Sequence, residues 1–232
     1  GRPMTGGLRI VDVEQGTDEW LEARRGMITA STVGQLVTPR TIQPAANPES
    51  RALVARLAAE RITGWVDDTY QSADMIRGTL DEPYARDYYA EHFAQVETCG
   101  LIVRDFEDGR SVGYSPDGLV GEAGAIEIKA PRAKVHVQTV IADAVPSVHM
   151  AQLQTGLYVT GRQWIDFISW CGGLPAFVKR TFPDERWQEA IESATCAAEI
   201  AIRETVERYR GAVRGLPATE RINHFSEIEV NA

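Results

Sequence analysis

The sequence predicts an α/β fold, a single domain in which a central mixed β-sheet is flanked by helices. Helical and strand patterns follow one another in the order helix, strands, helix, strands, helix, which is typical of such a sheet. The length of 232 residues suits one large domain, and a hydrophobic content of 44% is sufficient for a sizeable core. We expect this domain to span residues 8–215, between a cloning remnant with a flexible N-terminus at residues 1–7 and a C-terminal tail at residues 216–232.

Hydrophobic periodicity, capping residues and turn residues predict the individual helices and strands. Thr17 precedes two acidic residues as an N-cap does, and Thr29 to Ser31 is expected to cap a second short helix. Pro83 is expected in the first turn of a helix, and the proline-containing segment 38–48 is expected to be a loop. Besides two short helices between residues 16 and 37, the predicted helices cover residues 50–62, 80–93, 134–142, 148–159 and 184–210. The predicted strands cover residues 97–105, 111–114, 125–129, 164–170 and 176–182.

Composition argues against several classes of protein. No run of apolar residues approaches the roughly 18 to 20 that a membrane-spanning helix needs, and no charged-then-apolar leader opens the chain. Neither the three cysteines nor the four histidines have the spacing of metal ligands. The cysteines also lack the spacing of a disulfide framework, which indicates a reducing compartment. We therefore expect a cytoplasmic protein with no membrane partner.

The charge balance limits the ways in which the protein could bind nucleic acid. A formal net charge of −9 argues against a general nucleic-acid coat protein, which would be basic. It is compatible with an enzyme acting on nucleic acid, because acidic metal ligands can coexist with a local basic groove. Of the 24 basic residues, 21 are arginine, whose forked guanidinium binds phosphate oxygens in a bidentate manner.

A predicted β-hairpin carries the residues that most clearly point to chemistry. Asp117 lies in a Ser-Pro-Asp-Gly sequence, and a turn at residues 121–124 can fold the next strand back so that Asp117 approaches Glu127. Glu127 and Lys129 are two apart on this strand and therefore share a face. Two carboxylates and an ammonium on one face form a site for a hard cation with a candidate general base beside it, as in a metal-dependent nuclease.

Each part of this pattern also has a purely structural explanation. Ser-Pro-Asp-Gly alone is ordinary turn chemistry, and Glu127 with Lys129 alone could be an exposed, ion-paired strand face. The strand is otherwise apolar, however, and burying charges there is costly unless they are paired or bind a metal. Glu82, near the start of a predicted helix, is as consistent with a helix-dipole acid as with a third carboxylate of the site.

Two further groups of polar residues are candidates for the same site. Gln152 and Gln154 lie on an apolar helix and, at about 200° apart around its axis, cannot both face the site. Either could instead be a satisfied core amide. A second group surrounds a helix start and could bind a terminal phosphate, although simple capping with solvated arginines is at least as consistent with the local pattern. This group consists of Arg24, Arg25, Thr29 and Ser31.

Five segments of the sequence, in order, resemble the phage lambda exonuclease family, the YqaJ-like viral recombinase nucleases of the PD-(D/E)xK superfamily. The segments are residues 24–31, 78–86, 115–119, 127–129 and 150–154. A lone Glu-x-Lys is a weak signal, but five segments in the family order form a strong one. The resemblance extends over residues 20–182 and implies a restriction-endonuclease-like core.

The resemblance implies catalytic and metal-binding roles for the matched residues. Asp117, Glu127 and the backbone carbonyl of Ile128 would bind divalent ions, and Glu82 would reach the second ion directly or through water. Lys129 would orient or deprotonate the attacking water. We expect two Mg²⁺ ions, which Mn²⁺ can replace, because all the proposed ligands are oxygens.

The resemblance also bears on the glutamines and on the phosphate pocket. Gln152 matches the family's glutamine near the metal and nucleophile, whereas Gln154 begins a Gln-x-x-x-Tyr pattern with Tyr158 that related RecB-type nucleases show. Both glutamines therefore remain candidates. Arg24 and Ser31 match positions that hold the 5′-phosphate of the recessed strand.

The function implied by the resemblance is that of a Mg²⁺-dependent 5′→3′ exonuclease. Such an enzyme degrades one strand of linear double-stranded DNA with 5′-phosphorylated ends to 5′-mononucleotides and leaves a 3′ single-stranded tail. Family members form a ring-shaped trimer around DNA and act with a single-strand annealing protein in recombination, which implies a phage or prophage gene in a bacterial host. Two alternatives remain: a structure-specific or restriction-like endonuclease of the same superfamily, and a non-catalytic adaptor that binds DNA or a recombination protein.

Overall fold

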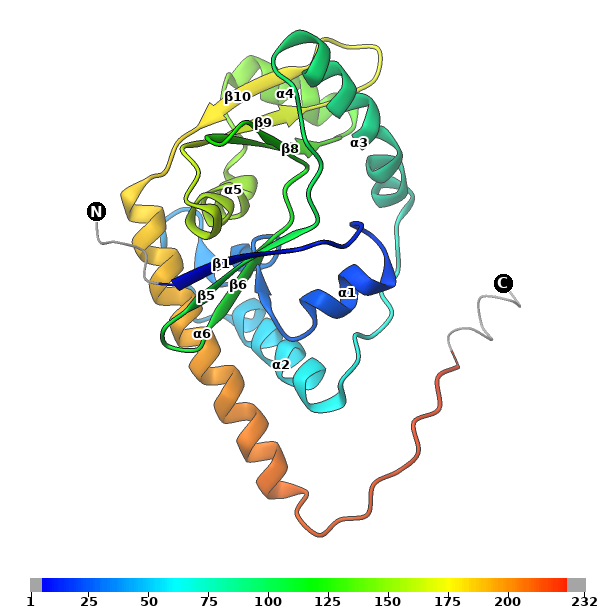
Figure 1. Cartoon of the computed structure of the whole chain (residues 1–232), viewed down its shortest axis with the longest axis vertical. Coiled ribbons are helices and arrows are strands. Elements are labelled where there is room, and N and C mark those ends of the chain that lie inside the picture. The colour runs from blue at the N-terminus through cyan, green and yellow to red at the C-terminus, as the bar shows by residue number, and fades with distance from the viewer. Residues whose placement is uncertain (1–5, 225–232) are drawn as a thin grey trace.

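The structure, a computed structural model, describes residues 6–224 (Figure 1). The helices are α1 (Asp18–Arg24), α2 (Pro48–Thr63), α3 (Ala73–His92), α4 (Ala133–Ala142), α5 (Ser147–Thr160) and α6 (Glu185–Ala212), with a 3₁₀ turn, η1, at Val33–Gln35. The strands are β1 (Gly6–Val11), β2 (Ile28–Thr29), β3 (Val37–Thr38), β4 (Gln43–Pro44), β5 (Leu101–Phe106), β6 (Ser111–Tyr114), β7 (Gly118–Val120), β8 (Gly124–Lys129), β9 (Trp164–Ser169) and β10 (Phe177–Thr181). Within this part of the chain no helix is long and apolar enough to span a bilayer.

The structure confirms the predicted α/β fold: eight of the ten strands form two mixed sheets of four strands each, and β3 and β4 form a separate two-stranded ribbon. One sheet has the order β1-β5-β6-β2 and the other β10-β9-β8-β7. In each sheet one pair is parallel, β2 with β6 and β8 with β9, and the other pairs are antiparallel. The chain passes from β6 to β7 through residues 115–117, so the turn that carries Asp117 connects the two sheets.

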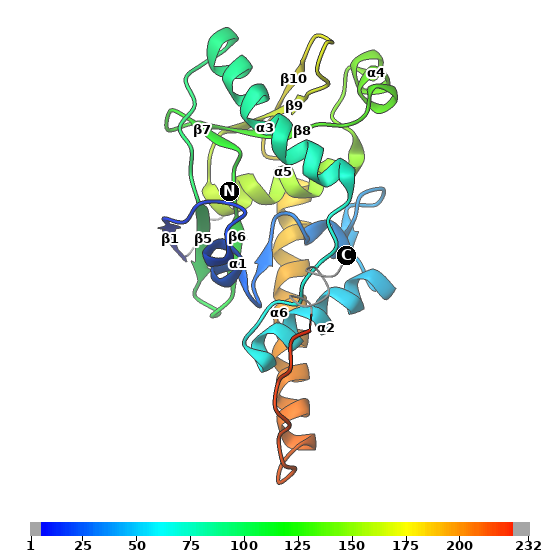
Figure 2. The same ribbon diagram turned by 90° about the vertical axis from the view of Figure 1, so that its right-hand side faces the viewer.

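Helix α5 lies between the two sheets, as both views show (Figures 1 and 2). It packs against β5, β6 and β9 and against α6, and its residues join a large apolar core with those of α2 and α6. Helix α3 covers the other face of the second sheet (Figure 2), where Ala85 and Tyr89 contact Ile126, Ile128 and Ile168. Strand β8 is therefore covered on both faces, which explains why its sequence is almost continuously apolar.

A buried ionic network attaches α3 to the second sheet. The Tyr89 hydroxyl donates to Asp166 Oδ2 at 2.7 Å, and Arg180 Nε donates to Asp166 Oδ1 at 2.8 Å. Asp166 is only 3% exposed, so both donors are needed to offset the cost of burying its charge. The network fixes the helix that carries Glu82 relative to the strand that carries Glu127.

The structure corrects several predicted boundaries. The second short helix, predicted to be capped by Thr29 to Ser31, is only the single 3₁₀ turn η1 after strand β2. Helix α3 begins at Ala73, capped by Ser72, so Pro83 lies inside the helix rather than in its first turn. Segment 38–48 contains part of the short β3–β4 ribbon. Strand β1, which begins within the segment predicted to be flexible, pairs with β5 along the sheet edge.

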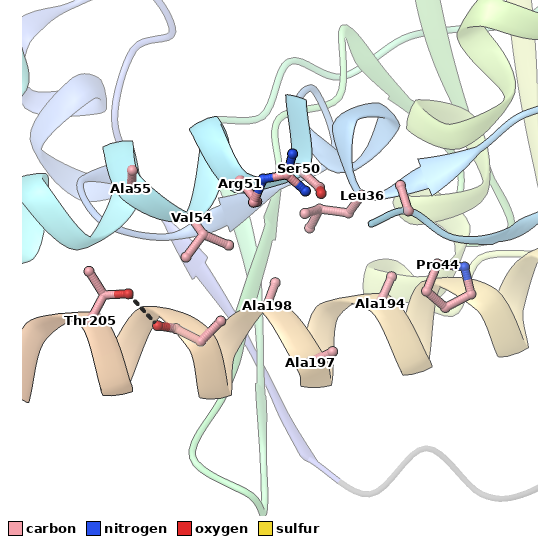
Figure 3. A pocket seen from close by; sticks show the side chains of 12 residues that line it. Leu36, Pro44, Ser50, Arg51, Val54, Ala55, Ala194, Ala197, Ala198 and Thr205 are labelled. Carbon is pink, nitrogen blue, oxygen red and sulfur yellow. Dashed lines mark hydrogen bonds between the residues drawn. The ribbon is translucent and has the colours of Figure 1, made fainter. Parts of the chain in front are cut away.

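An apolar groove lies between α2 and α6 (Figure 3). Its volume is about 390 Å³, and alanines of α6 form much of one wall. Arg51 of α2 lines this groove, on a different face of the helix from Arg56 and Glu60. The groove is separate from the residues that the sequence singles out for chemistry.

Candidate active site

Asp117 is fixed to strand β8 by two backbone contacts. Its N–H donates to the Ile126 carbonyl at 3.2 Å, and the Ile128 N–H donates to its Oδ2 at 2.6 Å. Strands β7 and β8 form the predicted hairpin, with Gly118 opposite Ile126. The turn and the strand thus place Asp117 beside Glu127, as the sequence predicts, and leave Oδ1 available for a cation.

Glu127 and Lys129 lie on the same face of β8 and contact each other. Lys129 Nζ is 3.2 Å from Glu127 Oε1, and Tyr114 donates its hydroxyl to Glu127 Oε2 at 3.1 Å. Lys129 also donates to Gln152 Oε1 at 2.8 Å, which ties the strand to helix α5. Glu127 is 3% exposed, whereas the Lys129 side chain is 29% exposed, so the group is buried at the carboxylate and open at the ammonium.

Burial and mutual charge shift the pKa values of these groups. Burial, and then the charges of Glu127 and Glu82, raise the pKa of Asp117 well above its usual range. Burial also raises the pKa of Glu127, although the Lys129 ammonium partly opposes this rise. For Lys129, burial lowers the pKa, but the charges of Glu127 and Asp117 outweigh burial and raise it. Lys129 therefore stays protonated in this arrangement, and a divalent cation would relieve the repulsion between the acids.

Glu82 approaches this group from α3 but is held by an arginine. Arg86 forms an ion pair with Glu82, one turn earlier on α3, and donates from Nε to the Asp117 carbonyl at 2.8 Å. Glu82 is close enough to raise the pKa of both Asp117 and Glu127. Across residues 6–224, no three His, Cys, Asp or Glu side chains converge closely enough to hold a metal ion by themselves.

Asp117 and Glu127 nevertheless fit a magnesium ion. Mg²⁺ keeps several of its waters and is commonly held by only one or two carboxylates, so a complete protein cage is not required. The donors here are all oxygens, including the Ile128 carbonyl on β8, which suits a hard cation rather than zinc. Glu82 fits a contact through water better than a direct one, because its carboxylate is bonded to Arg86.

The two candidate glutamines have different surroundings. Gln152 contacts Lys129 and so belongs to the group around Glu127. Gln154 is fully buried and bonds to the Phe182 carbonyl and the Asp184 N–H, where it supports the start of α6. Tyr158 stacks on Phe106 in the core, with ring centroids 5.4 Å apart. The structure therefore brings Gln152 to the site and places Gln154 and Tyr158 elsewhere.

The predicted phosphate pocket is partly assembled. Arg24 donates to Ser31 Oγ at 2.9 Å and to Thr29 Oγ1 at 3.3 Å, and its guanidinium lies 3.8 Å from the Trp20 ring centroid. Arg25 instead forms an exposed ion pair with Glu22. Arg24, Thr29 and Ser31 are thus together, and Arg25 is outside the pocket.

Trp20 connects the pocket to the carboxylates. Its indole Nε1 donates to Ser115 Oγ at 2.9 Å, two residues before Asp117, while its ring stacks on Arg24. The sequence motifs around residues 24–31 and 115–119 are therefore neighbours in space.

Sequence reasoning missed three residues of this region. Tyr114 bonds Glu127, Arg86 bonds both Glu82 and Asp117, and His149 is close enough to Lys129 for that charge to affect it. Burial, followed by the charge of Lys129, lowers the pKa of His149 to about 4, so it is neutral near pH 7. Tyr114 directly precedes Ser-Pro-Asp-Gly on a strand, which was the one available signal for it.

Comparison with known proteins identifies the family. No curated protein matches the sequence, but residues 19–163 match the YqaJ-like viral recombinase domain. An alkaline exonuclease from Laribacter hongkongensis is 32% identical with a TM-score of 0.75, and the same enzyme in complex with dAMP is 33% identical with a TM-score of 0.76. Each match covers 87% of this chain and 100% of the other. A phage-related exonuclease from Haemophilus somnus 129PT, 10% identical over 79% of this chain and 96% of its own, shares the fold with a TM-score of 0.62. The chain therefore belongs to the YqaJ-like viral recombinase family, and its function is that of a nuclease.

Proposed function

We propose that the protein is a Mg²⁺-dependent 5′→3′ exonuclease on linear double-stranded DNA. It releases 5′-mononucleotides and leaves a 3′ single-stranded tail for phage-type recombination. The observation that carries the proposal is the joined group of Asp117, Glu127 and Lys129, linked through Ser115 and Trp20 to the Arg24 pocket. The likeness to an alkaline exonuclease supports it.

The chain's own residues have distinct tasks in this proposal. Asp117, Glu127 and the Ile128 carbonyl would hold Mg²⁺, and Glu82 would contribute to a second ion through water. Bound Mg²⁺ supplies charge stabilisation at the scissile phosphate and a bound water of lowered pKa. Lys129 is protonated and hydrogen-bonded, so it acts by orienting the attacking water and by balancing charge.

The anion pocket would account for the proposed direction of digestion. Arg24 and Ser31 hold the 5′-phosphate at one end of the site, so the first phosphodiester of that strand reaches the carboxylates. Trp20 contributes to the spacing between the pocket and the carboxylates, because it contacts Arg24 on one side and Ser115, two residues before Asp117, on the other. An endonuclease would have no use for such an end-binding pocket.

Digestion of end-labelled linear duplexes tests the proposal. We expect label loss from each 5′ end before the 3′ end, in Mg²⁺ or Mn²⁺, and no digestion after chelation with EDTA. A covalently closed circular duplex should remain intact. Cleavage of the circle would instead show an endonuclease, and no cleavage of any substrate combined with DNA binding would show an adaptor.

Arg24→Ala should reduce the preference for 5′-phosphorylated over 5′-hydroxyl ends by about 10- to 100-fold, because a charge-assisted contact to phosphate contributes roughly 1.5 to 3 kcal/mol. The measurement is kcat/KM on the two kinds of duplex. Arg25→Ala is the matched control, since Arg25 is adjacent but paired with Glu22 on the surface. Equal loss of preference in both variants would contradict the assigned pocket.

The proposed cellular setting follows from the same function. We propose a ring-shaped homotrimer around DNA that acts with a single-strand annealing protein in the cytoplasm of a bacterial host, from a phage or prophage gene. Its mass in solution, with and without a duplex, tests the trimer. Co-purification with an annealing protein tests the partner.

A further inference from the structure

A second arginine reaches the cavity that Arg24 lines. This cavity has a volume of about 80 Å³ and lies between α1, the β2 segment and α2. Its polar lining consists of Arg24, Thr29, Thr32, Arg56 and Glu60. Arg56 comes from α2, more than twenty residues beyond the motif that suggested a phosphate pocket, and only the fold brings it there.

The cavity holds more positive than negative charge. Arg24 Nε is buried and has no hydrogen-bond partner within residues 6–224. Burial, and then the positive charge of Arg56, lower the pKa of Arg24 to about 10. Two guanidinium groups that disfavour each other in this way would both be stabilised by an anion between them.

Glu60 supplies part of that negative charge, because it forms an ion pair with Arg56 and partly opposes the fall in the pKa of Arg24, but its carboxylate is also engaged elsewhere. Its Oε2 accepts from the Gly26 N–H at 2.8 Å, and its Oε1 is 3.6 Å from Arg56, too far for a hydrogen bond. Arg61 completes this clamp by donating to the Gly26 carbonyl at 2.7 Å. Glu60 therefore holds the loop after Arg24 in place, and the half-exposed Arg56 keeps donors for a ligand.

We propose that Arg56 is the second cationic ligand of the terminal 5′-phosphate and that, with Arg24, it makes the enzyme selective for a phosphomonoester end. A terminal phosphate carries about −1.5 to −2 charges near pH 7, whereas an internal phosphodiester carries one. The two positive charges of the guanidinium groups balance the charge of a terminal phosphate, whereas they exceed the single negative charge of a phosphodiester. The inference rests on the proposed exonuclease function and adds the source of its end selectivity.

The test compares Arg56→Ala with Arg51→Ala on 5′-phosphorylated and 5′-hydroxyl linear duplexes. Arg51 is an exposed arginine of the same helix that lines the separate apolar groove, so its replacement should leave the preference unchanged. Arg56→Ala should lower the preference in kcat/KM by about tenfold or more. Arg56→Lys should recover only part of it, because an ammonium lacks the bidentate fork.

The pH dependence separates phosphate binding from a structural effect. In the wild type, the part of the preference that depends on Arg56 should be larger at about pH 7.5 than at about pH 5.5, since the second phosphate pKa is about 6. A structural role would lower activity on both substrates at both pH values. The melting temperature of each variant establishes whether it is folded. If Arg56→Ala is unfolded, the phosphate preference of Arg56→Lys provides the test instead.

Different results would contradict the proposed function and the role of Arg56. If the wild type does not digest linear duplexes, the proposed function is wrong. If it digests them and Arg24→Ala removes the preference while Arg56→Ala does not, the function stands and the role of Arg56 is wrong. A wild type with no preference for phosphorylated ends also overturns the inference.

Discussion

Asp117→Asn is expected to abolish Mg²⁺-dependent digestion and, at the same time, to stabilise the metal-free protein. The carboxylate is partly buried beside Glu127 and Glu82, which raises the pKa of Asp117. An ionised Asp117 therefore costs stability when no cation is present, and asparagine removes this cost. The asparagine carbonyl can still accept the Ile128 N–H, so the turn keeps its hydrogen bond.

The sign of the pH dependence follows from the raised pKa. Below the pKa of the unfolded chain, Asp117 is protonated in both states and contributes no cost. As the pH rises from the pKa of the unfolded chain through the raised pKa of the folded state, the cost grows and the free energy of unfolding falls. Asp117→Asn should flatten this part of the profile, measured by urea unfolding of metal-free protein from about pH 4 to about pH 8.

Magnesium should reverse the order of stability. Ligands that bind only the folded state raise its melting temperature, so Mg²⁺ should stabilise the wild type and leave Asp117→Asn nearly unchanged. Glu122→Gln is a matched control, because Glu122 is exposed in the turn between β7 and β8. A metal-free asparagine variant that is less stable than the wild type, or one that digests DNA normally, would show that Asp117 is not part of a carboxylate site.

The central hairpin could be predicted because its signals are local. Ser-Pro-Asp-Gly fixes a turn, and the alternation of Ile126, Glu127, Ile128 and Lys129 fixes which side chains share a face. Apolar residues around a glutamate also indicate that the charge has a buried partner. These local rules place the Asp117 backbone, Glu127 and Lys129 as the structure shows.

The remaining parts of the region depend on packing between distant segments. Helical periodicity predicts that only one of Gln152 and Gln154 can face β8. Which of them does so depends on the orientation of α5 about its own axis between the sheets. Arg56 approaches Arg24 because Glu60 and Arg61 clamp Gly26 against α2. No pattern near Arg56 in the sequence indicates that it lines the same cavity as Arg24, so this proximity could not be predicted before the fold was known.

Lys129→Met is expected to lower kcat by about 100- to 10,000-fold with a small change in KM, as for loss of a group that positions or exchanges a proton. Methionine keeps the length of the side chain but removes the contacts to Glu127 and Gln152. The Lys129 charge now lowers the pKa of Glu127 against the effect of burial, so its loss should raise that pKa further. Mg²⁺ binds the ionised carboxylate. The affinity of the protein for Mg²⁺ should therefore increase more steeply with rising pH in Lys129→Met than in the wild type.

Lys129→Arg and Gln152→Ala distinguish the ways in which Lys129 can act. If charge and orientation suffice, Lys129→Arg retains much of the activity that Lys129→Met loses, because arginine stays protonated. If the group must accept a proton, Lys129→Arg is as inactive as Lys129→Met. The raised pKa of Lys129 in this structure favours the first outcome. Gln152→Ala should have a smaller effect than either, since Lys129 keeps its ion pair with Glu127. Wild-type kcat in Lys129→Met would contradict any role of the ammonium in the reaction.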